Sequence, residues 1–398
     1  MIKKDLLTVF LTLFYFGISC DSVIPEAPPE DELLDGPMEG LSHAEQGLFL
    51  DGDIAFNDEV FSASDGLGPL FVATSCGSCH AGDGKGHPFT TLTRFGQTQP
   101  NVPPDLSIGG PQLQNRAIPG HLPETIPQGA PSMQLTPPAV TGLGFLAALT
   151  DEQILSNADP NDLNGDGISG VPNYATAPEY FEPQWFHRSE DGRYIGRFSK
   201  KASAIDLLQQ TVGAYNQDMG VTSTFEPLDT SSGLVNDPEV TDLTVANVVF
   251  YLRTLKAPIQ RNPDDSEIIQ GQELFNTIQC ASCHIPEWTT PESDINALAN
   301  QTFYPYTDLL LHDMGPGLDD GVTEGSAETF EWRTPPLWGL GLSPDSQGGS
   351  FFLMHDGRAR SIEEAILLHG GEGQSSRESF QELSSSEQQA LLKFLESL

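Results

Sequence analysis

Two short motifs hold the residues with the most distinctive chemistry in this chain. Each has the pattern C-x-x-C-H, and together they comprise Cys76, Cys79, His80, Cys280, Cys283 and His284. Two thiols three positions apart can form thioethers to the two vinyl groups of one haem, and the histidine that follows can bind the iron. The motifs therefore predict two covalently attached c-type haems.

Two other kinds of site also use cysteine pairs. A zinc site would require both pairs to lie close together, and it would not explain a histidine after each pair. A thioredoxin-like redox pair would require a βαβ context, and the residues around both motifs lack the alternation that strands show. Haem attachment accounts for all six residues.

Helices must position these motifs. Apolar residues recur at helical spacing in residues 266–279, just before the second motif. Capping-box patterns predict helices that begin after Ser42, Ser361 and Ser384. Neither half shows the regular alternation of a sheet protein, and the 39 Gly and 31 Pro indicate many loops. The sequence predicts a mainly α fold, with two cytochrome c-like haem domains and long ordered loops.

The expected division of the chain follows from these elements. A helix over residues 240–255 closes an N-terminal haem c domain of residues 41–256, and residues 257–398 form a C-terminal cytochrome c domain. The hydrophobic fraction of 38% is enough to build their cores, which excludes general disorder.

Charge restricts the partners. The chain has 398 residues, with 18 basic against 56 acidic side chains and a formal net charge of −38. Phosphate backbones repel a polyanion of this size, so nucleic-acid binding is excluded as a function. The same charge attracts basic proteins, and we expect a basic electron-donor protein.

The N-terminus indicates export. Lys3 and Lys4 precede an apolar run that is too short to span a bilayer and suits a signal peptide over residues 1–20. The run ends at Cys20 after small residues, which resembles a lipoprotein signal. An acidic tether over residues 21–40 follows. We expect a protein of the periplasm or cell envelope that is attached to a membrane through lipid at Cys20. The alternative is an ordinary signal peptide in which Cys20 has no role.

Several longer stretches resemble one family. They are GLGPLFVATSCGSCH, QLQNRAIPG, DLNGDGISGVPNY, DMGVTS, DLLLHDMGPGL, EWRTPPLWGLGL and MHDGRARSIEEAILLHGGE. With the two motifs, they resemble the di-haem oxidoreductases of the bacterial cytochrome c peroxidase and MauG superfamily. They are most similar to the branch described as di-haem oxidoreductase, putative peroxidase. The resemblance runs from about residue 40 to the C-terminus.

The resemblance implies iron ligands for the second haem. In the peroxidases, a methionine 14 residues after the histidine of a His-x-Gly element binds the far face of that haem. Counting from His355, this position is His369. The second haem would then be held by His284 and His369, with a lower reduction potential than a His/Met site. Alternatively, His369 caps the end of a helix.

The resemblance also implies residues around the first haem. Asp218 stands where the peroxidases carry the glutamate that assists cleavage of the O–O bond, and Lys201 could donate to the distal pocket. The tryptophan that relays electrons between the peroxidase haems is absent from residues 196–202. For the sixth iron ligand three histidines are candidates: His87, His121 and His187.

A calcium loop is predicted between the motifs. Four residues follow the spacing of an EF-hand-type loop, Asp162, Asn164, Asp166 and the carbonyl of Ile168. Asn173 stands in place of the final bidentate glutamate, so the affinity for Ca²⁺ should be modest.

Together these features predict an exported di-haem oxidoreductase that reduces hydrogen peroxide at the first haem with electrons delivered through the second. Two alternatives remain at this point. One is an electron-transfer cytochrome without catalysis, and the other is MauG-like oxidation of a protein or organic substrate.

Overall fold

The computed structural model describes residues 28–103 and 109–398. The predicted signal peptide, Cys20 and the start of the acidic tether lie outside these residues. In the part that is described, no helix combines the length and apolar character needed to cross a membrane.

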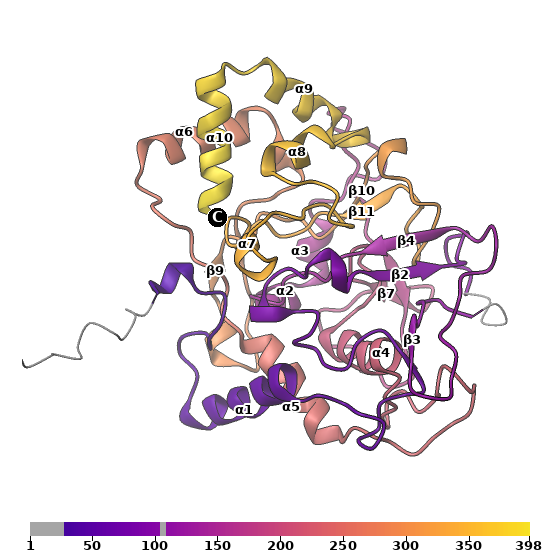
Figure 1. Ribbon diagram of the computed structural model, residues 1–398. Coiled ribbons are helices and arrows are strands. Elements are labelled where there is room, and N and C mark those ends of the chain that lie inside the picture. The colour runs from indigo at the N-terminus through magenta and orange to yellow at the C-terminus, as the bar shows by residue number, and fades with distance from the viewer. Residues whose placement is uncertain (1–27, 104–108) are drawn as a thin grey trace, which may run out of the picture.

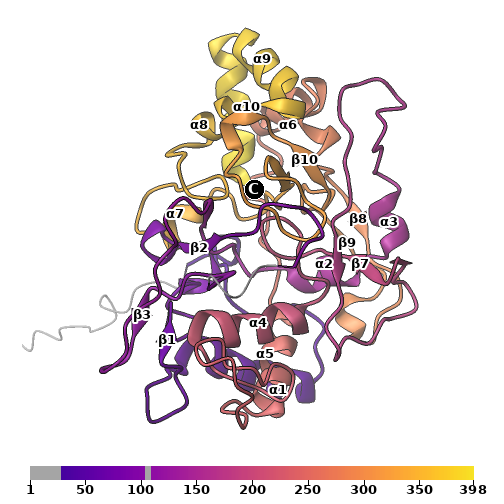
Figure 2. The same cartoon turned by 90° about the vertical axis from the view of Figure 1, so that its right-hand side faces the viewer.

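Helices gather at the two ends of the molecule (Figures 1 and 2). One end holds α1 (His43–Asp53), α4 (Leu207–Met219) and α5 (Asp242–Thr254). The other end holds α6 (Ser266–Thr277), α8 (Ile362–Leu367), α9 (Gln374–Glu382) and α10 (Ser385–Ser397). The short helices α2 (Leu143–Ala148), α3 (Asp151–Leu155) and α7 (Ser343–Ser346) lie between the two ends.

Short antiparallel strands fill the middle of the molecule. Five small sheets pair β1 with β3, β2 with β4, β8 with β9 and β10 with β11, and combine β5, β7 and β6. The strands are β1 (Leu70–Phe71), β2 (Leu92–Phe95), β3 (Arg116–Ala117), β4 (Ser132–Leu135), β5 (Tyr174–Thr176), β6 (Ser189–Glu190), β7 (Arg193–Ile195), β8 (Trp288–Thr289), β9 (Thr302–Phe303), β10 (Leu311–Asp313) and β11 (Glu331–Arg333).

The prediction of a mainly α fold is wrong. The structure is 32% helix and 11% strand, which makes it a mixed fold with ten helices and several small sheets in the described residues. The strands are two to four residues long, so they are too short to show the period-2 alternation by which a strand is recognised in a sequence.

Each end is built around a close pair of helices. In α1, a Cβ added to Gly52 would overlap the carbonyl oxygen of Asn247 in α5. In α6, a Cβ added to Gly271 would overlap the carbonyl oxygen of Ala390 in α10. Only glycine lets the backbones approach this closely. The same device therefore packs the helix that precedes each motif against a later helix of the chain.

The largest hydrophobic core joins both halves of the chain. Leu146, Leu252 and Leu255 pack there with Trp288 and Trp338. A second core lies wholly within residues 268–398, between α6, α8 and α10. The first core thus crosses the predicted boundary at residue 256, and that boundary stays a prediction.

Candidate functional site

One internal cavity of about 610 Å³ connects the two C-x-x-C-H motifs. All six motif residues line it, together with His369 and Asp218. Its wall is drawn from segments between Phe56 and Leu395, so both ends of the molecule contribute.

The two motifs fold alike. His80 and His284 each donate their backbone N–H to the carbonyl oxygen of the first cysteine of the motif at 3.0 Å. The first motif follows β1, and the second continues directly from α6. In each, one tight turn places two sulfur atoms and one imidazole on the cavity wall.

Both motif histidines are held in the same protonation state. The Nδ1 atom of His80 lies 2.9 Å from the carbonyl oxygen of Pro138. The Nδ1 atom of His284 lies 2.9 Å from the carbonyl oxygen of Tyr306. A carbonyl cannot donate, so Nδ1 carries the proton in both rings and Nε2 keeps its lone pair. Burial lowers the pKa of each histidine to about 4. Both rings are therefore neutral at pH 7, as iron ligands must be.

His369 has the same arrangement. Its Nδ1 donates to the carbonyl oxygen of Ala365 at 2.8 Å, which also caps the last turn of α8. The ring lines the cavity, and the charge of protonated His369 would lower the pKa of His284, because the two rings lie near each other. Capping and iron binding use different nitrogens, so the two predicted roles of His369 are compatible.

The four motif thiols are partly buried and neutral. Burial raises the pKa of Cys76 and Cys280 to about 12 and that of Cys79 to about 11, and it raises the pKa of Cys283 as well. Zinc binds thiolates, which this environment disfavours. Among residues 28–103 and 109–398, no three His, Cys, Asp or Glu side chains converge as a metal site. Neutral thioethers fit these positions better than thiolates do.

The charge on the cavity wall is the reverse of the charge on the whole chain. Six basic residues line the cavity: Lys85, Arg94, Arg197, Lys200, Arg333 and Arg377. Four acidic residues do so: Asp218, Glu226, Glu324 and Glu372. In the whole chain, acidic residues outnumber basic ones by 56 to 18. Each haem brings two carboxylate propionates, and buried anions need cationic partners. The donor set, the neutral sulfurs and this charge all fit haem.

A group of polar side chains that we call the Asp218 cluster lines the cavity wall: Arg94, Gln112, Asp218 and Glu324. Gln112 donates from Nε2 to Oδ1 of Asp218, and Arg94 pairs with Glu324 at 2.5 Å. Asp218 lies in the last turn of α4, close enough to the first motif for its charge to raise the pKa of both thiols there. The pairing of β2 with β4 brings Arg94 to this wall.

The carboxyl group of Asp218 has a pKa close to neutral pH. Burial raises its pKa to about 6, although the hydrogen bond from Gln112 and the charge of Arg94 act in the opposite direction. A carboxyl group with such a pKa can both accept and deliver a proton near pH 7. Arg94 and Glu324 were not predicted from the sequence, since no motif surrounds them.

Lys201 is placed differently from the expectation. It is fully buried, does not line the cavity, and lies 4.0 Å from the centroid of the Trp332 ring. Its ammonium donates to three main-chain carbonyl oxygens, those of Glu328, Thr329 and Glu331 (2.9, 3.1 and 2.6 Å). A tight turn bridged by Phe198 and Ala204 points Lys201 into the protein, whereas its neighbour Lys200 lines the cavity.

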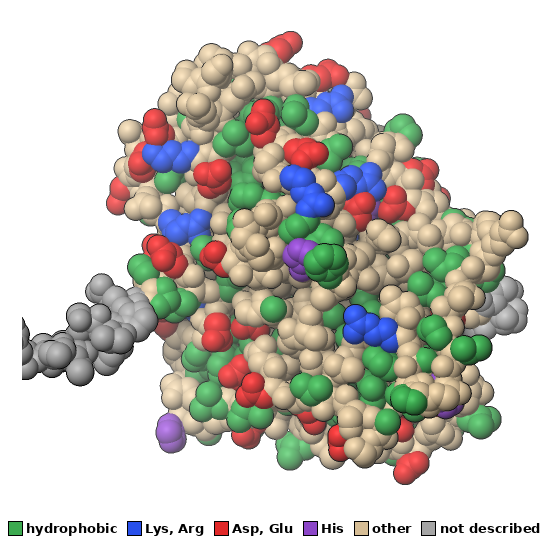
Figure 3. Space-filling model, viewed as in Figure 1, with side chains coloured by type: hydrophobic (Ala, Val, Ile, Leu, Met, Phe, Trp, Pro, Cys, Tyr) green, Lys and Arg blue, Asp and Glu red, His purple; other side chains and the backbone are tan. Residues whose placement is uncertain are grey.

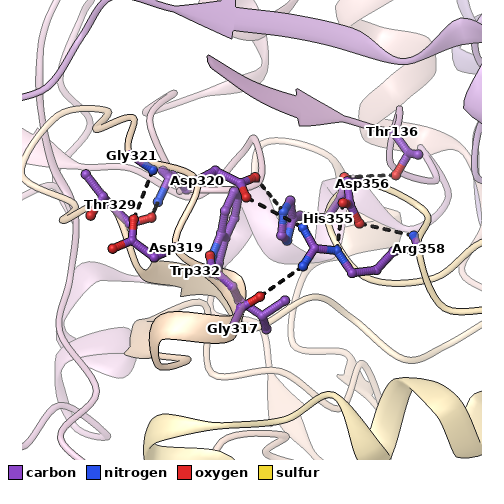
Figure 4. Close-up of polar contacts among 12 residues, drawn as sticks. Thr136, Gly317, Asp319, Asp320, Gly321, Thr329, Trp332, His355, Asp356 and Arg358 are labelled. Carbon is purple, nitrogen blue, oxygen red and sulfur yellow. Dashed lines mark hydrogen bonds and ion pairs between the residues drawn. The ribbon is translucent and has the colours of Figure 1, made fainter. Parts of the chain in front are cut away.

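Trp332 also belongs to a small polar network (Figure 4). The ring of His355 stacks on Trp332 with centroids 3.7 Å apart, and its Nε2 lies 2.8 Å from Asp320. Arg358 is fixed by Asp356 at 2.7 Å. The carbonyl of His355 accepts from the backbone N–H of Thr136 at 2.8 Å. This bond ties the C-terminal segment to the one that holds His80.

None of the three histidines proposed as a sixth ligand to the first haem lines the cavity. His87 accepts a hydrogen bond from the backbone of Phe89, and His121 is exposed. The Nε2 of His187 faces Arg197 at 3.2 Å. The structure brings none of them toward His80.

The predicted calcium loop is stabilised by its own side chains. The side-chain Oδ1 atoms of three loop residues accept hydrogen bonds from backbone N–H groups. Asp162 accepts from Gly167 at 3.2 Å, Asn164 accepts from Asp166 at 2.9 Å, and Asp166 accepts from Ile168 at 2.9 Å. Gly167 has a φ of 83°, which supplies the sharp turn expected at that position.

Comparison with protein families gives one match. Residues 133–398, two thirds of the chain, match the family described as "Di-haem oxidoreductase, putative peroxidase". The chain belongs to this family. The resemblance inferred from the sequence motifs is thereby confirmed. For this di-haem oxidoreductase, the matched residues include the second motif, Asp218 and His369, while the first motif precedes them.

The solved structures that resemble this chain are distant from it in sequence. A Kuenenia stuttgartiensis hydrazine synthase pressurised with xenon is 14% identical, covers 100% of this chain and 99% of its own, and gives a TM-score of 0.41. A MauG-like protein associated with microbial copper homeostasis is 16% identical, covers 63% of this chain and 89% of its own, and gives a TM-score of 0.33. No curated protein matches this di-haem oxidoreductase.

Proposed function

We propose that this protein is an exported di-haem c-type oxidoreductase that reduces hydrogen peroxide beside the first motif. One observation carries the proposal. A single cavity joins both motifs, and the two motifs differ in what accompanies them. A second neutral histidine, His369, accompanies the second motif, and the Asp218 cluster accompanies the first.

Haem, when bound, supplies the electrons and the coordination position that peroxide reduction requires. The two cysteines of each motif would hold it as thioethers. His80 and His284 would bind iron through Nε2, with Nδ1 oriented by the Pro138 and Tyr306 carbonyls. His369 would occupy the remaining iron position at the second motif.

Asp218 moves the proton. Reduction of H₂O₂ to two water molecules consumes two electrons and two protons, and one peroxide oxygen must lose a proton that the departing oxygen gains. Ionised Asp218 can accept that proton, and its raised pKa allows the acid to return it. Gln112 fixes the carboxylate by donating to Oδ1. We assign the cavity-facing cation near His80 to Lys200 rather than to Lys201.

Electrons would enter at the second motif. A site with two histidine ligands leaves no position for an oxidant, which suits electron transfer. Acidic side chains are spread over the face drawn in Figure 3, in keeping with the net charge of −38. We infer that the donor is a basic protein, and that its rate of association falls as ionic strength rises.

Two measurements test the function. The denatured protein should stain for covalent haem and carry the mass of two such groups. Ferric EPR should show one high-spin signal that cyanide changes and one low-spin signal that it does not.

Paired variants assign the signals. Replacing Cys76 and Cys79 by alanine should remove the high-spin signal and peroxide reduction together, while the same change at Cys280 and Cys283 should remove the low-spin signal. Two low-spin signals in the wild type, both indifferent to cyanide, would leave only the electron-transfer alternative.

We also propose that the loop of residues 162–168 binds Ca²⁺. The loop is connected to the second motif through a chain of polar contacts. Ser169 donates to Glu372 at 2.5 Å, Glu372 lies 2.6 Å from His312, and Nδ1 of His312 lies 3.6 Å from the sulfur of Cys283. Chelation of Ca²⁺ should lower the melting temperature, Ca²⁺ but not Mg²⁺ should restore it, and Asp166→Asn should abolish the response. An unchanged melting temperature after chelation would remove calcium from the proposal.

Export and anchoring rest on the N-terminal sequence. We propose that Cys20 carries lipid after removal of the signal peptide. Labelled palmitate supplied to growing cells should be incorporated by the wild type and by Cys76→Ala, but not by Cys20→Ala. Incorporation that survives Cys20→Ala would leave an ordinary signal peptide.

A further inference from the structure

Three cations on the cavity wall have no acidic partner. Lys85, Lys200 and Arg333 line the cavity, and in the described part of the chain none of them forms an ion pair. Two other cavity cations differ in this respect, since Arg94 pairs with Glu324 and Arg197 with Asp151. We call Lys85, Lys200 and Arg333 the cation cluster.

The members of the cation cluster lie close together. Arg333 donates its backbone N–H to the carbonyl of Lys200 at 3.0 Å and its Nε to that of Ser199 at 2.9 Å. The backbone of Lys85 is fixed by a hydrogen bond that its carbonyl oxygen accepts from the Ser346 hydroxyl at 2.9 Å. Burial, together with the charges of Lys85 and Arg333, lowers the pKa of Lys200 to about 7.

The cation cluster adjoins the first motif. The charge of Lys200 lowers the pKa of His80, so the ammonium lies near that ring. Two acids act on the cluster: the charge of Asp356 acts on Lys200, and that of Asp308 acts on Arg333. Asp356 is already paired with Arg358 at 2.7 Å and Asp308 with His312 at 2.8 Å, so they do not neutralise the three cations.

Like charges gathered in a buried cavity are unfavourable unless an anion joins them. Nε and Nη1 of Arg333 donate to the carbonyl oxygens of Ser199 and Thr334 (2.9 and 3.1 Å). A carboxylate would therefore be contacted by Nη2 of Arg333 and by the two flexible ammonium groups. The volume beside the cluster is cavity rather than protein. An anion must therefore come from a bound molecule.

We propose that Lys85, Lys200 and Arg333 form a carboxylate-binding site beside His80. Its ligand is either the propionates of the haem at the first motif or a free carboxylate that enters the cavity. The proposal depends on the proposed function only for the presence of that haem.

The test measures the reduction potential of each haem against pH in the holoprotein, by spectroelectrochemistry. Lys200→Met is the test variant, and Lys85→Met is the second variant should the first fail to fold. Lys393→Met, which removes a charge that is exposed and paired on α10, is the matched control. Because potential and not turnover is recorded, the result does not depend on peroxidase activity.

If propionates are the ligand, the cations keep them ionised, and the wild-type potential is constant between about pH 5 and 8. Lys200→Met then makes the potential of the first haem pH-dependent in this range and leaves the second haem unchanged. If a free carboxylate is the ligand, no pH dependence appears, and sodium acetate instead shifts the wild-type potential saturably but not that of Lys200→Met. Should Lys200→Met match Lys393→Met in both experiments, the proposal is overturned.

Discussion

Asp218→Asn separates a catalytic role for this carboxyl from a structural one. The substitution keeps the shape of the side chain and leaves an oxygen to accept from Gln112, but it removes the titrating proton. Loss of a general acid or base costs about 10²- to 10⁴-fold in rate. We therefore expect kcat/KM for hydrogen peroxide to fall by that factor, equivalent to about 3 to 5 kcal/mol of transition-state stabilisation.

The same substitution should stabilise the protein at neutral pH. The pKa of Asp218 rises from 3.8 to about 6 on folding, and one unit corresponds to 1.36 kcal/mol, so ionised Asp218 costs the fold about 3 kcal/mol. This cost is absent below pH 3.8, where the group is protonated in both states, and complete above pH 6. The Asp218→Asn variant should therefore have a higher melting temperature than the wild type at pH 7.5, and this difference should vanish as the pH falls toward 4.

The assays are steady-state peroxide reduction and thermal unfolding followed by circular dichroism at several pH values. Asp51→Asn, on the exposed face of α1, is the control and should change neither. In the wild type, activity should fall as pH drops through about 6, because protonated Asp218 cannot accept a proton. A variant that keeps its rate within tenfold of the wild type would falsify the role of Asp218, and one that loses both rate and stability would show a structural role.

Three further substitutions test the ligands and the packing. His369→Met should raise the potential of the second haem and change its low-spin EPR signal while the high-spin signal stays; changes in both signals would contradict the ligand assignment. Gly271→Ala should destabilise the protein by about 1 to 3 kcal/mol, because its Cβ would overlap Ala390, whereas Gly47→Ala, with open space around it, should not. Lys201→Met should cost at least about 3 kcal/mol, because three buried carbonyls lose their donor. A melting temperature equal to that of the wild type would return Lys201 to the list of candidate distal donors.

Local signals in the sequence predicted several of the helices. The capping boxes at Ser42 and Ser384 are present, and α1 and α10 begin at the next residue. The helix expected over residues 240–255 spans Asp242–Thr254. The helix expected after Ser361 begins at Ile362 and ends at Leu367, two residues before His369. Caps act within four residues, so they can be read from the sequence, whereas helix ends that depend on tertiary packing shift by one or two positions.

Long-range features could not be predicted in this way. The short strands were missed, since β2 and β4 contain four residues each and their partners lie about 40 residues apart. The same pairing brings Arg94 to the wall of the cavity, and only the fold brings it together with Gln112 and Glu324. The turn at residues 198–204 decides which of two adjacent lysines meets the cavity, and the local sequence does not specify that choice.

The shared cavity has a consequence for how the protein matures. Its wall is assembled from segments between Phe56 and Leu395, so both halves of the chain contribute to the space that a haem would fill. With haem attached as proposed, thioether formation would have to reach both cysteine pairs while the polypeptide is still open. A chain loaded at one pair only would close over a partly empty space, which is costly, and such half-loaded molecules should be more sensitive to proteolysis than fully loaded ones.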